Sequence, residues 1–139
     1  MTVFKHIAPR IALGLVLFAA PLSAAALPPL SRVDEIDNNM LYVGIAIEIS
    51  DECPTIEARK IKGLNFLWTL KAVASEMGYS NAQIEEYVTS KDEKARIRAK
   101  GAAYARARGV DPTTSAGLCA LGEMEIAKGS VIGSLLRAK

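Results

Sequence analysis

Apolar residues recur along most of the chain at the spacing of helices. The segment 40–50 carries the densest run, and its apolar positions fit both the alternation of a strand and two stripes of a helix. No other segment offers an obvious partner strand, and Asn38 or Asn39 can cap a helix that starts here. We therefore favour a buried helix over 40–50, with a strand as the alternative.

A second helix is expected after Pro54, which ends the first element, with Thr55 as its N-cap. It should run over about 56–77, because Gly78 follows. Its apolar residues form two stripes, Ile61, Leu64 and Trp68 on one side and Phe66, Leu70, Val73 and Met77 on the other. A helix with two apolar faces belongs in the middle of a bundle, so we expect Trp68 in the core rather than on a binding surface.

Two capping-box patterns mark the next helix starts, Ser80 with Gln83 and Ser90 with Glu93. The apolar stripe moves round the helix between these two segments, which indicates a kink or break near 89–92. A longer helix is then expected over about 91–108, with Gly109 as its stop.

The last stretch of the chain is helical in composition but rich in glycine. We expect an element to begin at Asp111-Pro112, because proline suits a first helical turn. An interior glycine lowers helix propensity by up to about 1 kcal/mol, so breaks are expected near Gly122 and Gly129. Glu125 shares a face with buried apolar positions and needs an arginine partner if it is buried; the alternative is the edge of the stripe, in water.

The N-terminus has the pattern of a secretory signal peptide. A basic start precedes an uncharged apolar run over 11–22, and the small residues Ala24 and Ala26 fit cleavage between Ala26 and Leu27. The run of about 12 residues is short for a spanning helix, which needs about 20. We expect residues 1–26 to be removed on export to the periplasm, with no stable membrane insertion after cleavage.

The expected cleavage removes 26 of 139 residues and leaves 113, a length that fits one domain with a modest core. No internal repeat or low-complexity linker divides the remainder, so 27–139 is expected to form a single helical domain. Its start, 27–38, contains two prolines and is polar and acidic, and we interpret it as an extended acidic arm.

Cleavage also changes the chemistry that the protein can support. Loss of Lys5 and Arg10 leaves 15 basic and 15 acidic residues, and the only histidine, His6, is lost too. Without histidine there is no Ser-His-Asp or Cys-His nucleophile and no histidine-containing zinc site. No phosphate-binding glycine loop or calcium-binding loop is present. We therefore assign no catalytic, cofactor-binding or metal-binding residue.

Cys53 and Cys119 are the only cysteines, separated by 66 positions. Two cysteines in an oxidising compartment predict one structural disulfide, with free or intermolecular thiols as the alternative. The sequence therefore predicts an all-α fold, a small irregular bundle of four to six helices stapled by this disulfide.

Charge is divided unevenly along the chain. Segment 27–58 has one basic and seven acidic residues, whereas 59–139 has fourteen basic and eight acidic residues. The two halves could form a polarised surface for a charged partner, but internal neutralisation or solvated faces are the favoured interpretation. The basic residues of 91–108 are scattered round the helix, which does not indicate nucleic-acid binding.

Four stretches carry a family resemblance: LPPLSRVDEID, IxxxDECPTIxAR, GYSxxQIEEYVxSKxEKARIRAKGxAY and CALGxxEIAKGSxIGxLLRAK. Together they resemble a family of unknown function made of small exported alphaproteobacterial proteins, over essentially the whole of 27–139. The resemblance implies a helical fold with the two cysteines bridged, and it transfers no catalytic or binding residue.

We expect an exported, non-enzymatic protein that binds a protein partner, as an accessory of an envelope complex or in an inhibitor or immunity role. A small enzyme that uses carboxylates or lysine is the alternative, and a buried carboxylate pair with a raised pKa would favour it. A periplasmic stress chaperone that exposes apolar surface is a further alternative.

Overall fold

The computed structural model of the protein describes residues 25–139. The expected signal peptide therefore lies outside the described residues, apart from Ala25 and Ala26. Along the chain the elements are a 3-10 turn η1 (Leu30–Arg32), α1 (Asp34–Glu52), β1 (Ile56–Ala58), α2 (Lys60–Glu76), α3 (Asn81–Thr89), α4 (Lys91–Arg106), α5 (Ser115–Lys128), α6 (Val131–Ser134) and β2 (Leu136–Ala138).

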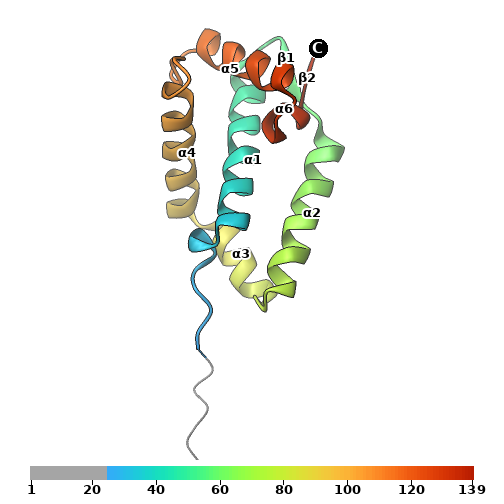
Figure 1. Cartoon of the computed structure of the whole chain (residues 1–139), viewed down its shortest axis with the longest axis vertical. Coiled ribbons are helices and arrows are strands. Elements are labelled where there is room, and N and C mark those ends of the chain that lie inside the picture. The colour runs from blue at the N-terminus through green and yellow to red at the C-terminus, as the bar shows by residue number, and fades with distance from the viewer. Residues whose placement is uncertain (1–24) are drawn as a thin grey trace, which may run out of the picture.

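The fold is the predicted all-α bundle, with α1 as its central helix (Figure 1). α4 packs along one side of α1 and α2 stands on the other, while α3 joins them at one end and α5 and α6 cover the opposite end. The segment 40–50 lies entirely within α1, so the prediction of a helix rather than a strand is confirmed.

The apolar core consists of two clusters of buried side chains. The larger one joins the second half of α1 to α5, α6 and the short strands, with Ile49, Leu121 and Ile132 at its centre. The smaller one joins η1 and the start of α1 to α2 and α3 through Leu30, Leu70 and other residues. α2 is therefore anchored mainly by its second half.

A two-stranded antiparallel sheet closes one end of the bundle. Ile56 pairs with Ala138, and Ala58 pairs with Leu136, so the end of the chain lies beside the start of α2. This pairing changes two predicted boundaries. The helix predicted from about residue 56 begins at Lys60, and Thr55 does not cap it, because 56–58 is used as a strand.

The acidic arm predicted over 27–38 is wrong in its second half. Asp34 is the first residue of α1, and only the residues before η1 are extended. Asp34, Glu35 and Asp37 occupy the first turn of α1, where negative charge interacts favourably with the helix dipole. Ile36 is buried among them and fixes this turn against the smaller core cluster.

The helix starts predicted at Ser80 and Ser90 are confirmed, but only the first has the predicted capping box. Ser80 and Gln83 form a complete capping box at α3, and the Ser90 side chain accepts a hydrogen bond from the Glu93 backbone at α4. The predicted break falls at Ser90, between the two helices.

The last part of the chain departs from the prediction at two points. α5 begins at Ser115 after an N-cap at Thr114, rather than at Asp111-Pro112. It continues through Gly122 and ends at Gly129, whose left-handed backbone (φ 65°) suits glycine. The break predicted near Gly122 is therefore wrong, and the one at Gly129 is confirmed.

Candidate functional site

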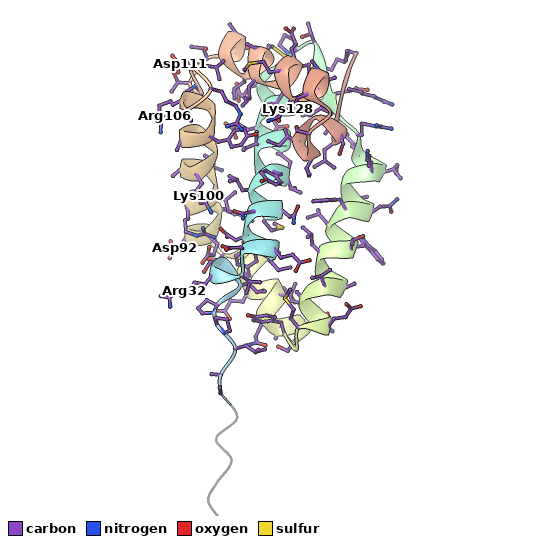
Figure 2. The ribbon with its side chains drawn as sticks, viewed as in Figure 1. Arg32, Asp92, Lys100, Arg106, Asp111 and Lys128 are labelled. Carbon is purple, nitrogen blue, oxygen red and sulfur yellow. A yellow bond between two sulfur atoms is a disulfide. The ribbon has the colours of Figure 1, made fainter. Side chains whose placement is uncertain are left out.

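A long apolar groove runs along the described part of the chain. Its floor is one face of α1, its walls come from α2 and α4, and α3 and the start of α5 contribute at the two ends. The groove has a volume of about 910 Å³, and most of its lining is apolar. Figure 2 shows side chains of α1 and α2 projecting into the space between these two helices.

The groove exists because α2 turns one of its two apolar stripes toward solvent. Trp68 is 75% exposed and Ile61 is 73% exposed, and Leu64 is exposed as well. The prediction that Trp68 belongs to the core is therefore wrong. On the floor, Ile47 of α1 is 51% exposed, so large apolar groups face water on the floor and on one wall of the groove. Such a concentration of exposed apolar residues is typical of an interaction site.

The charged residues that line the groove are mostly basic. They are Lys71 on α2, Lys94, Arg98 and Arg106 on α4, and the acids Glu48 and Glu93. Glu93 is already bound by Arg96, with 2.7 Å between Oε2 and Nε. None of the four basic residues forms an ion pair with another part of the described chain, 25–139. The rim of the groove therefore carries excess positive charge.

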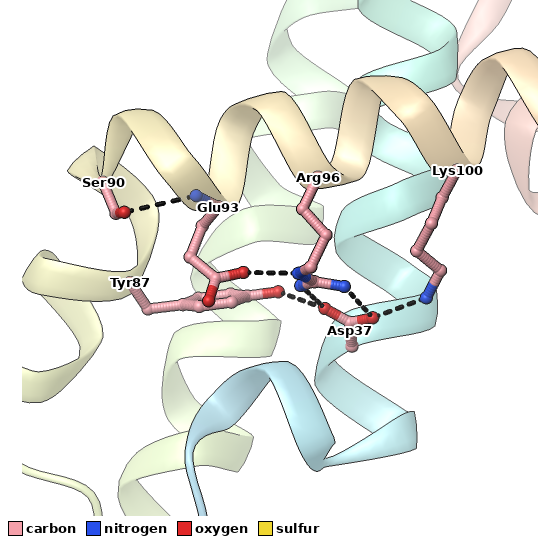
Figure 3. A network of polar contacts seen from close by, with 6 residues as sticks. All are labelled: Asp37, Tyr87, Ser90, Glu93, Arg96 and Lys100. Carbon is pink, nitrogen blue, oxygen red and sulfur yellow. Dashed lines mark hydrogen bonds and ion pairs between the residues drawn. The ribbon is translucent and has the colours of Figure 1, made fainter.

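One wall of the groove is tied to its floor by a buried carboxylate, Asp37 (Figure 3). Asp37 on α1 is 3% exposed, and its oxygens accept hydrogen bonds from three side chains. Lys100 Nζ lies 2.7 Å from Oδ2, and the Tyr87 hydroxyl donates to Oδ1 at 2.8 Å. The guanidinium of Arg96 contacts both oxygens. α1, α3 and α4 therefore meet at one carboxylate.

The electrostatics of this cluster keep Asp37 ionised. Burial by itself would raise the pKa of Asp37, but the hydrogen bonds from Arg96, Lys100 and Tyr87 outweigh burial and lower the pKa to about 2. The pKa of Tyr87 is raised by burial and by its hydrogen bond to Asp37. The pKa of Arg96 is raised above its ordinary value, chiefly by its hydrogen bond to Asp37.

A second buried carboxylate, Glu125 on α5, is 1% exposed. Tyr104 donates a hydrogen bond to its Oε1 at 2.7 Å, and Arg108 Nε lies 3.1 Å from the same oxygen. The arginine partner that burial requires is therefore present. Burial opposes ionisation, but the hydroxyls of Ser130 and Tyr104 and the charge of Arg108 lower the pKa of Glu125. Burial and Glu125 raise the pKa of Tyr104 to about 12.

Cys53 and Cys119 form the predicted disulfide. Cys53 caps the end of α1 and Cys119 lies in α5, with 5.1 Å between their Cα atoms. The disulfide holds the end of the floor helix against α5. Close packing continues beside it, because a Cβ atom at Gly122 would come within 2.8 Å of Ile49 Cγ2.

Only some acidic residues of 27–58 form ion pairs with basic residues of 59–139. Asp37 is paired with Arg96 and Lys100, and Glu57 is paired with Arg137 across the sheet. Among the described residues, the remaining acidic residues of 27–58 form no ion pair, and their side chains are exposed or half-buried. Internal neutralisation and solvation, the two favoured interpretations, therefore both occur.

The acidic side chains of the described residues are not gathered into one cluster. Within 25–139, no group of three or more cysteine or acidic side chains could hold a metal ion. The two buried carboxylates belong to separate clusters. Asp37 is paired with Arg96 and Lys100, Glu125 is paired with Arg108, and each carboxylate also accepts a hydrogen bond from a tyrosine hydroxyl.

Two sequence signals could have revealed this site. Lys71 continues the stripe of Leu64 and Trp68 at helical spacing, and a lysine on that line indicates a face in contact with water. Asp37 lies three and four residues before the partly buried Met40 and the buried Leu41, a position that places its carboxylate on the inner face of α1.

No helix in the described part of the chain is both long and apolar enough to span a membrane. Comparison with curated proteins and with solved structures finds no match. A family model described as a family of unknown function, DUF5333, matches residues 28–137, which include every helix of the bundle and all of the groove. The chain therefore belongs to the DUF5333 family.

Proposed function

We propose that this protein is an exported, periplasmic binding protein without catalytic activity, which holds an apolar segment of a protein partner in the groove between α1, α2 and α4. The observation that carries this proposal is the exposure of Trp68, Leu64 and Ile47 around one continuous groove. A tryptophan exposed within a contiguous apolar patch is typical of a surface that another molecule covers.

Other features support a binding role over an enzymatic one. A carboxylate whose pKa is lowered is a poor general acid near neutral pH, and both buried carboxylates, Asp37 and Glu125, have lowered pKa values. The cluster around Asp37 fixes α4 to α1, and the disulfide fixes the other end of α1. A rigid floor and wall reduce the entropic cost of binding a partner.

The proposal includes an accessory role in an envelope complex or an inhibitor or immunity role. Export to the periplasm is supported by the signal pattern of 1–26 and by the disulfide, which persists in oxidising compartments. The open groove also favours a second candidate, a chaperone that binds exposed apolar segments of many proteins.

Photo-crosslinking tests the proposal. A photoreactive phenylalanine analogue replaces Trp68 in the groove, and a matched variant carries it at Ala99, which is exposed on α4 outside the groove. We expect irradiation of intact cells to give one crosslinked protein from position 68, identified by mass spectrometry, and none from position 99. Equal crosslinking from both positions would contradict the proposal, and a broad mixture from position 68 alone would favour the chaperone.

A further inference from the structure

The shape of the groove fits a helix. α1, α2 and α4 supply a floor and two walls, and the position between the walls is open to solvent. The lining face of α1 extends from Ile36 to Glu48, a distance of about 18 Å at 1.5 Å per residue. An added helix of about three to four turns would pack against all three helices, as in a four-helix bundle.

The charges on the rim are distributed along this length. Lys94, Arg98 and Arg106 follow one another on α4 over about 18 Å of helix, and Lys71 stands on the opposite wall. All four side chains are exposed, and none is in an ion pair within the described residues. Acidic groups on the flank of an occupant that faces α4 would find partners along most of its length, and an acidic group on the other flank would find Lys71.

This distribution distinguishes a helix from a lipid or a fatty acid. A fatty acid carries one anionic group at one end of its chain, and a single cation suffices to bind it. Here four cations are spread along two walls, and Trp68 at the rim stays 75% exposed. Small-molecule pockets bury most of their ligand, whereas an open groove with spread charges is typical of helix recognition.

We propose that the occupant of the groove is an amphipathic helix of a protein partner, with an apolar stripe facing α1 and acidic residues along both flanks. The inference rests on the proposed function and specifies the chemistry of its partner. The apolar stripe would cover Ile47, Leu64 and Trp68, and the acidic flanks would pair with Lys71, Lys94 and Arg98.

The experiment uses synthetic peptides and the fluorescence of Trp68, which is the only tryptophan of the chain. The test peptide has about 16 residues, no tryptophan, leucines at helical spacing and glutamates on both flanks. One control peptide carries lysines in place of the glutamates, and another has the same composition in scrambled order. We expect the acidic peptide to shift the Trp68 emission to the blue in a saturable way, and both controls to bind at least about tenfold more weakly.

Charge reversal in the protein provides the second arm. The double variant Lys94→Glu with Arg98→Glu should bind the acidic peptide at least about tenfold more weakly and the lysine peptide more tightly than the unchanged protein does. The control is Lys91→Glu, on the same helix and also exposed but not among the residues that line the groove, and it should change binding by less than about twofold. Thermal unfolding of each variant checks that the fold is retained.

Several outcomes would overturn the inference. Equal binding of the acidic and lysine peptides, or an equal effect of Lys91→Glu and the double variant, would show that the rim charges do not select the occupant. A blue shift with palmitate or with phosphatidylglycerol vesicles, but not with the acidic peptide, would assign the groove to a lipid. If the photoreactive residue at position 68 crosslinks one protein in cells while the acidic peptide fails to bind, the proposed function stands and this inference alone is wrong.

Discussion

Lys100 Nζ lies 2.7 Å from a carboxylate oxygen of Asp37, although the two residues are 63 positions apart in the chain. Arg96 contacts the same carboxylate from the preceding turn of α4. These contacts join the acidic first part of the chain to its basic second part, and they also join the floor of the groove to one wall. The shape of the candidate site therefore depends on one buried charge.

Asp37→Asn tests that dependence. The substitution removes the negative charge and leaves Arg96 and Lys100 facing a neutral group, so we expect a loss of about 3 kcal/mol in the free energy of unfolding, measured with urea. Asp34→Asn, at an exposed position in the same first turn, should cost less than about 1 kcal/mol. Equal losses for the two variants would mean that the buried ion pairs add nothing to stability.

The stability of the protein should also depend on pH through Asp37. Its pKa in the folded protein is about 2, against 3.8 as its ordinary value, so its stabilisation is complete above about pH 5 and is lost as the pH falls from there through the folded pKa. The shift corresponds to about 2 kcal/mol. Other carboxylates titrate in the same range. The measurement is therefore the difference in the free energy of unfolding, determined with urea, between the unchanged protein and the Asp37→Asn variant. That difference should shrink on going from about pH 5 to about pH 2, and a constant difference would contradict the assignment.

Local signals in the sequence predicted much of the fold. The helix over 40–50, the capping box at Ser80, the break at Ser90 and the end at Gly129 all depend on residues within a few positions of one another. The expectation of export and the even cysteine count predicted the disulfide without any knowledge of geometry. The helix and its boundaries could be read from the chain because their energies are set locally.

The features that the sequence did not reveal depend on distant contacts. Residues 56–58 are a strand only because 136–138 pairs with them. Apart from Lys71 on one of them, the two apolar stripes of α2 look alike in the sequence, and the packing against α1, η1 and α3 buries Leu70 and leaves Trp68 exposed. The groove results from this packing, so the spacing of apolar residues alone could not predict the candidate site.

Gly122 explains why α5 continues where a break was predicted. A Cβ atom there would lie 2.7 Å from Ile56 Cδ1 and 2.8 Å from Ile49 Cγ2, so the absent side chain allows the core to close. Gly122→Ala should therefore destabilise the protein by about 1–3 kcal/mol through overpacking, despite the better helix propensity of alanine.

Gly63→Ala is the matched control for this prediction. Gly63 lies inside α2, and a Cβ atom there would meet no atom within 4 Å. The substitution should stabilise the protein by about 0.5–1 kcal/mol, seen as a higher midpoint of thermal unfolding. If both alanine variants changed stability in the same direction, packing at Gly122 would not be the reason for its glycine.

The disulfide should contribute strongly to stability. Cys53 and Cys119 are 66 positions apart, and closing a loop of this length restricts the unfolded chain by about 4 kcal/mol. The double variant Cys53→Ser with Cys119→Ser should lose a large part of this in urea unfolding at neutral pH. Intact mass after alkylation without reductant should show no modified thiol in the unchanged protein, and two modified thiols would show that the disulfide is absent in solution.

Trp68 and Leu70 lie two residues apart on α2, and substitutions at these two positions should distinguish an effect on binding from an effect on folding. Leu70 is 8% exposed within the smaller core cluster, so Leu70→Ala should cost about 2–5 kcal/mol of unfolding free energy. Trp68 is 75% exposed, so Trp68→Ala should lower the free energy of unfolding by less than about 1 kcal/mol. In that variant, a photoreactive residue placed at Ile47 should no longer crosslink the partner. A stability loss at Trp68 as large as that at Leu70 would mean that α2 closes over the groove in the free protein, because only a buried tryptophan contributes so much to folding.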